Sequence, residues 1–143
     1  MKKISSIIKL ILLIAWMILI FLLSNQPGST SSNTSSAFVI KIYELLHITS
    51  IDVNVFLKKY IGLIRKLAHF SEFFILAILS YINIKDYSNN PLVYNLIFGL
   101  LYAISDEIHQ LFIINRHCSI YDVGIDFLGT IISSILIHIL CRK

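Results

Sequence analysis

Charged residues are scarce in this sequence. They make up 14% of the 143 residues, whereas 57% are hydrophobic, and the mean hydropathy is +0.81. A water-soluble domain needs far more polar surface than this composition provides. The net charge of +4 comes mostly from lysines near the ends of apolar runs, whereas nucleic-acid-binding proteins gather basic residues on a soluble face. The composition excludes a soluble globular domain, and we expect no nucleic-acid partner.

Cysteine is also scarce. Cys118 and Cys141 are the two in the sequence, and they fall at opposite ends of the last apolar run. Neither belongs to a C-x-x-C pair or to another spacing that binds metal. Two residues so far apart along a helix are not expected to pair. A disulfide scaffold and a cysteine-based metal centre are therefore not predicted.

Long apolar runs are what the sequence does contain. Four of them are long enough to cross a membrane as helices, at about residues 4–24, 61–84, 92–114 and 122–141. No small-x-small cleavage site follows the first run, which favours a retained helix over a signal peptide. The length allows one domain. We therefore expect an all-α polytopic membrane protein whose single domain spans residues 1–143 and has four transmembrane helices.

The segment between the first two runs is too polar to cross a membrane. Residues 28–36 (GSTSSNTSS) have no hydrophobic period and are predicted to form an exposed loop. Residues 37–49, and residues 53–64 after a predicted N-cap at Asp52, each place apolar side chains on one helical face. We expect two amphipathic helices there, lying on the membrane surface or folded over the bundle.

Charges are unevenly distributed within the last three runs. They occupy the first half of the second run, the second half of the third and the first half of the fourth. Because consecutive spans alternate in direction, all three charged halves should reach the same side of the membrane. Lys2, Lys3 and Lys9 place the N-terminus in the cytoplasm, although lysine and arginine divide evenly between the two sides. The sequence thus predicts cytoplasmic N- and C-termini and an outward-facing polar site.

The densest polar stretch within apolar sequence is Tyr102–Gly129, which holds four of the eight carboxylates. Ionisable groups in membrane spans are costly, so they tend to be paired and functional. Asp106 lies deep enough to need a cationic partner, for which Arg65, Lys66 and Arg116 are the candidates. Helical spacing predicts three shared faces, formed by Arg65, His69 and Glu72, by Asp106, His109 and Gln110, and by Asp122 and Asp126.

The tryptophan and three of the glycines are predicted to have structural roles. Trp16 is predicted to act as an interfacial anchor. Gly99, Gly124 and Gly129 are predicted to allow helices to pack closely.

Three segments carry short polar motifs, at Lys66–Leu79, Ala103–Gly129 and Ser24–Pro27. Together these segments resemble the VanZ family. Lys66–Leu79 (KLAHFSEFFILAIL) is similar to the segment in which Arg or Lys-x-x-His-Phe-x-Glu opens a helix. Ala103–Gly129 resembles the segment with Ser-Asp-Glu-x-x-Gln, Arg and Asp-x-x-x-Asp, and Ser24–Pro27 (SNQP) resembles the short polar motif after the first helix. The order of these motifs is specific, and the resemblance covers residues 10 to about 135. It implies a four-helix protein of the bacterial cell membrane, linked to the cell envelope and to resistance against the glycopeptide teicoplanin.

Four interpretations of the polar cluster stay open. The first is recognition, and hydrolysis or transfer, of a phosphate-bearing lipid such as a lipid-linked cell-wall intermediate. In that interpretation the substrate-binding residues are Arg65, Lys66 and Arg116. The predicted catalytic residues are His69, Glu72, Asp106, Glu107, Gln110, Asp122 and Asp126, with Asp106 or Glu107 as base and His69 as acid or nucleophile.

The other three interpretations involve no such reaction. One is a set of buried ion pairs that fix helix register. Another is a site for a divalent cation such as Mg²⁺ or Mn²⁺, because carboxylate-rich shells suit these ions. The possible ligands are His69, Glu72, Asp106, Glu107, His109, Asp122 and Asp126. The last is non-catalytic binding of a lipid or glycopeptide by an accessory protein. The sequence alone identifies neither the substrate nor the oligomeric state.

Overall fold

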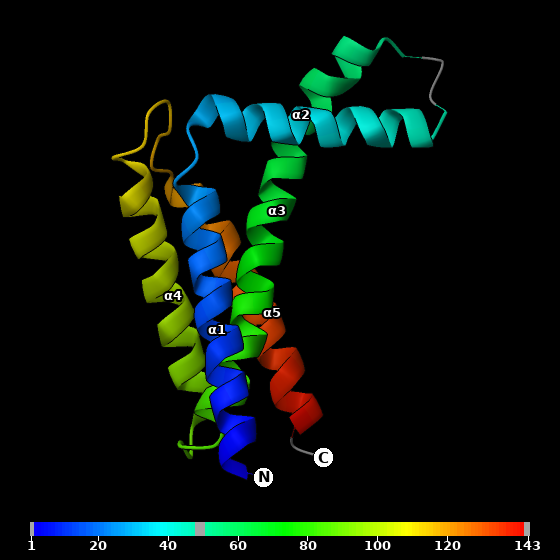
Figure 1. Cartoon of the computed structure of the whole chain (residues 1–143). Coiled ribbons are helices and arrows are strands. Elements are labelled where there is room, and N and C mark those ends of the chain that lie inside the picture. Colours follow the sequence, from blue (N-terminus) through cyan, green and yellow to red (C-terminus); the bar gives the residue numbers. More distant parts are fainter. Residues whose placement is uncertain (1, 48–50, 142–143) are drawn as a thin grey trace.

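The computed structural model describes residues 2–47 and 51–141, and within them it contains five α-helices and no strand. α1 (Lys2–Ser24), α3 (Val53–Ile84), α4 (Pro91–Gln110) and α5 (Ile120–Cys141) form a bundle, and α2 (Gly28–Leu45) crosses one end of it (Figure 1). The four bundle helices are each long and apolar enough to cross a membrane. The all-α class with four spans is confirmed, and the chain is a multi-pass membrane protein.

The two ends of the bundle differ in character. The start of α1, the end of α5 and the α3–α4 connection lie at one end, and α2 and the loop of residues 111–119 lie at the other (Figure 1). The N-terminal half of α3, the C-terminal half of α4 and the N-terminal half of α5 therefore meet near α2. This is the arrangement that the uneven distribution of charges predicted.

The connection between the first two spans differs from the prediction. Residues 28–36 form the first half of α2 rather than a loop. The hydroxyl groups of Thr34, Ser35 and Ser36 each donate to the backbone carbonyl four residues earlier, at 2.8–3.1 Å. Such bonds satisfy the hydroxyl groups inside the helix, so a serine-rich segment can be helical without a hydrophobic period.

The second amphipathic helix is not a separate element. Residues 53–64 are the first turns of α3, a continuous helix of 32 residues that begins after Asp52. Asp52 caps it by accepting a hydrogen bond from the Asn54 amide at 2.8 Å. A helix of this length measures about 48 Å, whereas the hydrocarbon core is about 30 Å thick. The polar first turns therefore extend past α2 at the end of the bundle (Figure 1).

The last two spans begin or end at slightly different residues than predicted. α4 ends at Gln110 instead of residue 114, and a series of turns follows in which Asn115 has a φ of 58°. α5 begins at Ile120 instead of residue 122. The turns leave residues 111–119 as a loop that folds back toward the end of α1, where the Gly28 amide donates to the Ile114 carbonyl at 3.0 Å.

Close contacts and polar cross-links hold the helices together. A Cβ at Gly129 would lie 2.5 Å from the Phe70 carbonyl, and one at Gly99 would lie 2.4 Å from the Thr130 side chain. The prediction that glycines allow close helix packing is confirmed for these two positions. It is wrong for Gly124, where a Cβ would have no neighbouring atom within 4 Å. The small apolar core comprises Ile20, Phe73, Leu76 and Ala103.

Trp16 has a different role from the expected interfacial anchor. Its indole N–H donates to the Glu72 carbonyl at 2.9 Å, and the Tyr102 hydroxyl donates to the Met17 carbonyl at 2.9 Å. These two bonds attach the middle of α1 to α3 and α4. Interhelical hydrogen bonds of this kind supplement van der Waals packing in membrane bundles.

Candidate functional site

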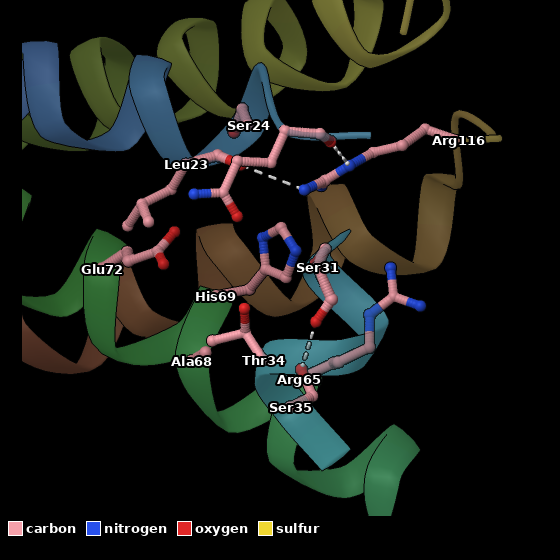
Figure 2. A pocket seen from close by; sticks show the side chains of 11 residues that line it. Leu23, Ser24, Ser31, Thr34, Ser35, Arg65, Ala68, His69, Glu72 and Arg116 are labelled. Atoms are coloured by element: carbon pink, nitrogen blue, oxygen red, sulfur yellow. Dashed lines mark hydrogen bonds between the residues drawn. The ribbon is translucent and has the colours of Figure 1, made fainter. Parts of the chain in front are cut away.

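A polar cavity of about 120 Å³ lies at the α2 end of the bundle (Figure 2). Four parts of the chain contribute to it: the end of α1, the first half of α2, the middle of α3 and the 111–119 loop. This volume has room for several water molecules or for one phosphate-sized group. Its lining consists of Leu23, Ser24, Gln26, Ser31, Thr34, Ser35, Arg65, Ala68, His69, Glu72 and Arg116.

Three of the predicted residues, Arg65, His69 and Glu72, reach this cavity from one face of α3, as their spacing predicted. In Figure 2 the imidazole of His69 lies between Glu72 on one side and Arg65 on the other. All three side chains are half-buried. Lys66 is exposed and does not line the cavity.

Arg116 connects the loop to the end of α1. Its Nε donates to the Gln26 carbonyl at 3.0 Å and its Nη2 donates to the Leu23 carbonyl at 3.0 Å. The last carbonyls of a helix lack amide partners within the helix, so a guanidinium there caps the helix and opposes its dipole. Burial, and secondarily the nearby Arg65, lower the pKa of Arg116, but an arginine side chain stays charged at neutral pH.

Asp106 does not form the ion pair that its depth suggested. Its Oδ2 accepts hydrogen bonds from the Ser24 hydroxyl and from the Gln110 side-chain amide, both at 2.9 Å. Within the described residues, no lysine or arginine lies within ion-pair distance of it. The nearest connection to a cation runs through Gln110, whose Oε1 accepts from Arg116 Nη1 at 3.1 Å.

Asp126 and His69 approach each other inside the bundle. Asp126 Oδ1 lies 3.6 Å from His69 Nδ1, and Asp126 is fully buried. One ligand atom from each of His69, Asp106 and Asp126 lies within 4.8 Å of the other two. The structure thus brings together one predicted residue from each of α3, α4 and α5.

Glu107 and Asp122 lie outside this group. Glu107 is buried, and its Oε2 accepts from the Ser119 amide at 2.9 Å, which attaches the start of α5 to α4. Asp122 lines a second polar cavity of about 150 Å³ together with Gly62, Arg65, Lys66 and His69. His109 does not join Asp106 and Gln110 either, because its ring stacks on Phe21 with centroids 4.7 Å apart.

Sequence reasoning missed the residues that α1 and α2 contribute. Ser24 and Gln26 belong to the SNQP motif. The motif itself does not indicate that Ser24 contacts Asp106 or that Gln26 contacts Arg116. Ser31, Thr34 and Ser35 were assigned to an exposed loop, yet they form one wall of the cavity. The signal that could have found them is the unusual density of hydroxyl groups beside a membrane span.

An apolar groove of about 390 Å³ adjoins the polar cavity between α2 and α3. The two share Thr34, Ser35 and Ala68 in their linings. The remaining lining of the groove is mostly apolar and consists of Phe38, Ile64, Leu67 and Ser71.

Comparison with known proteins gives one result. Neither a curated protein nor a solved structure matches the chain. The VanZ/LLP1 family model matches residues 9–141, a range that includes the cavity and the cluster of His69, Asp106 and Asp126. The resemblance found in the motifs is confirmed over nearly the whole chain, which therefore belongs to the VanZ/LLP1 family.

Proposed function

We propose that this VanZ-like protein recognises a phosphate-bearing lipid, with the headgroup in the polar cavity and the hydrocarbon chain in the adjoining groove. The observation that supports this most is the adjacency of the two spaces, which share Thr34, Ser35 and Ala68 in their linings. A ligand that fills both must be polar at one end and apolar at the other. Anionic lipids have this structure.

The cavity has donors available for an anion. Arg65 makes no hydrogen bond to the described residues, so its five N–H groups are free for a ligand. Arg116 uses three of its five N–H groups for the protein. The planar fork of arginine matches the geometry of phosphate oxygens better than lysine does.

Turnover of the bound lipid is a second candidate function, favoured by Glu72 and His69, which both line the cavity. In hydrolysis, water would attack phosphorus, Glu72 would accept a proton from that water and His69 would donate one to the leaving oxygen. Asp106 and Glu107 are less suited as base, because their carboxylates accept hydrogen bonds from Ser24, Gln110 and Ser119. Without turnover, the protein would be an accessory that binds a lipid or a glycopeptide.

We place the protein in the bacterial cell membrane with both termini cytoplasmic, so that the cavity faces outward. Lipid-linked cell-wall intermediates are then the class of partner it would meet, in keeping with a family linked to glycopeptide resistance.

Adjacent basic residues on α3 provide a matched test of the binding site. Arg65→Gln is expected to weaken binding of a polyprenyl phosphate by about 10-fold or more, because charge-assisted phosphate contacts are lost. Lys66→Gln removes the same charge from an exposed side chain outside the cavity and is expected to change affinity less than about 3-fold. The measurement is lipid titration of each purified variant in detergent.

Equal affinity of the two variants would contradict the assignment of the headgroup to this cavity. Glu72→Gln, assayed in parallel, separates binding from turnover. It should still bind the lipid but release no phosphate if hydrolysis occurs. Absence of phosphate release from the unmodified protein would leave the binding role alone.

A further inference from the structure

The strongest unexplained feature of the bundle is the carboxylate of Asp126. Asp126 has 0% exposure, and neither Oδ1 nor Oδ2 has a hydrogen-bond partner. His69 Nδ1, which lies 3.6 Å from Oδ1, also has none. A buried charged group without partners is costly enough that another species is expected to neutralise it.

The surroundings of Asp126 add negative charge. Asp106 is 7% exposed, and its carboxylate lies within 4.8 Å of that of Asp126, so two buried carboxylates lie together on α4 and α5. The cation nearest to Asp106 along the hydrogen-bond network is Arg116, and it reaches Asp106 only through Gln110. This region is therefore suited to a cation of more than one charge.

We infer that His69, Asp106 and Asp126 bind one divalent transition-metal ion, Mn²⁺ or Zn²⁺, at the junction of α3, α4 and α5. Their candidate ligand atoms all lie within 4.8 Å of one another. Two ligands about 2.1 Å from one ion are roughly 3.4 Å apart in tetrahedral geometry, close to the 3.6 Å between His69 and Asp126. One imidazole with two carboxylates suits these ions better than Ca²⁺ or Mg²⁺, which take oxygen ligands.

Neighbouring residues would hold the ligands in place. Both hydrogen bonds to Asp106 fall on Oδ2, from Ser24 and from Gln110, which leaves Oδ1 for the ion. Hydrogen bonds of this kind orient metal-binding carboxylates. His69 also lines the polar cavity, so an ion at this site would lie beside the proposed headgroup position. With the ion bound, His69 would be a neutral ligand, and solvent would supply the proton for the leaving oxygen in its place. The inference does not depend on the lipid, because the ion is measured without it.

The test uses the full-length protein, purified in detergent, treated with EDTA and then freed of the chelator. Calorimetric titration with Mn²⁺, Zn²⁺ and Mg²⁺ should show one site for Mn²⁺ or Zn²⁺ with micromolar affinity or tighter, and weaker binding of Mg²⁺. Asp126→Asn and His69→Gln should each bind at least about 10-fold more weakly. Glu44→Gln, which removes an exposed carboxylate from α2, should bind like the unmodified protein.

If a ligand variant does not fold, the effect of the ion on the melting temperature of the unmodified protein still tests the site. The ion should raise the melting temperature of the unmodified protein, because it binds the folded state alone, and should not raise that of His69→Gln. Absence of binding by all three ions would overturn the inference. Unchanged affinity in both ligand variants, or equally tight Mg²⁺ binding by the unmodified protein and His69→Gln, would also overturn it.

Discussion

Replacing Arg116 with alanine is expected to destabilise the protein by about 3–5 kcal/mol, because the carbonyls of Leu23 and Gln26 and the side chain of Gln110 lose their shared donor. The same change removes one of the two guanidinium groups in the cavity. Affinity for a polyprenyl phosphate should therefore fall by about 100-fold or more. Thermal unfolding and lipid titration of the purified variant measure the two effects.

Two further variants show whether the effect comes from charge or from geometry. Arg116→Lys keeps the charge, but one ammonium group cannot reach the three acceptors that the planar guanidinium reaches, so intermediate stability and affinity are expected. Lys41→Ala removes an exposed charge from α2 and should change neither quantity. An Arg116→Ala protein that melts and binds lipid like the unmodified protein would contradict this role.

A membrane-impermeant thiol reagent is expected to label one of the two native cysteines and not the other. Cys118 is exposed in the 111–119 loop near α2, whereas Cys141 is exposed at the end of α5, at the opposite end of the bundle. If the termini are cytoplasmic, a membrane-impermeant thiol reagent applied to intact cells should label Cys118 in the Cys141→Ser variant. It should not label Cys141 in the Cys118→Ser variant.

Permeabilised cells supply the control, because both single-cysteine variants should then react. The reverse result in intact cells, with Cys141 labelled and Cys118 protected, would place the termini outside and the cavity on the cytoplasmic side. The lipid would then be sought in the inner leaflet, because the geometry of the cavity does not depend on the orientation.

The arrangement of the bundle could be predicted from the sequence because two strong patterns define it. Apolar runs of about twenty residues indicate membrane helices, and the alternation of their direction brings the charged halves to one end. The shared face of Arg65, His69 and Glu72 followed from helical spacing alone. These predictions use only the length of apolar runs, the alternating direction of the spans and the periodicity of a helix, and the structure agrees with them.

The partners of each polar residue could not be predicted in the same way. Spacing fixes which residues share a face, but it does not fix how far each helix is rotated about its axis. Asp106 was expected to pair with a cation, whereas the rotation of α4 turns it toward the end of α1, where Ser24 donates to it. Its other donor, Gln110, lies four residues later on the same helix, on the face that spacing predicted. Glu107, one residue later, faces the start of α5 instead.

The helical state of residues 28–36 was missed for a local reason. Serine and threonine are weak helix formers whose hydroxyl groups usually favour turns and caps. In α2 those groups instead bond to carbonyls four residues earlier, and the helix lies across the bundle with Val39 buried. Tertiary packing overrides this local preference, and the resulting helix forms one wall of the cavity.

The most direct test of phosphate recognition compares two lipids that differ only in the headgroup. Purified protein in detergent would be titrated with undecaprenyl phosphate and with undecaprenol, each with Mg²⁺ and with EDTA. We predict that the phosphate lipid binds at least about 10-fold more tightly than the alcohol under both conditions, because it alone can use both guanidinium groups. Equal affinity for the two lipids under both conditions, or tight binding of teicoplanin with none of the phosphate lipid, would contradict the account.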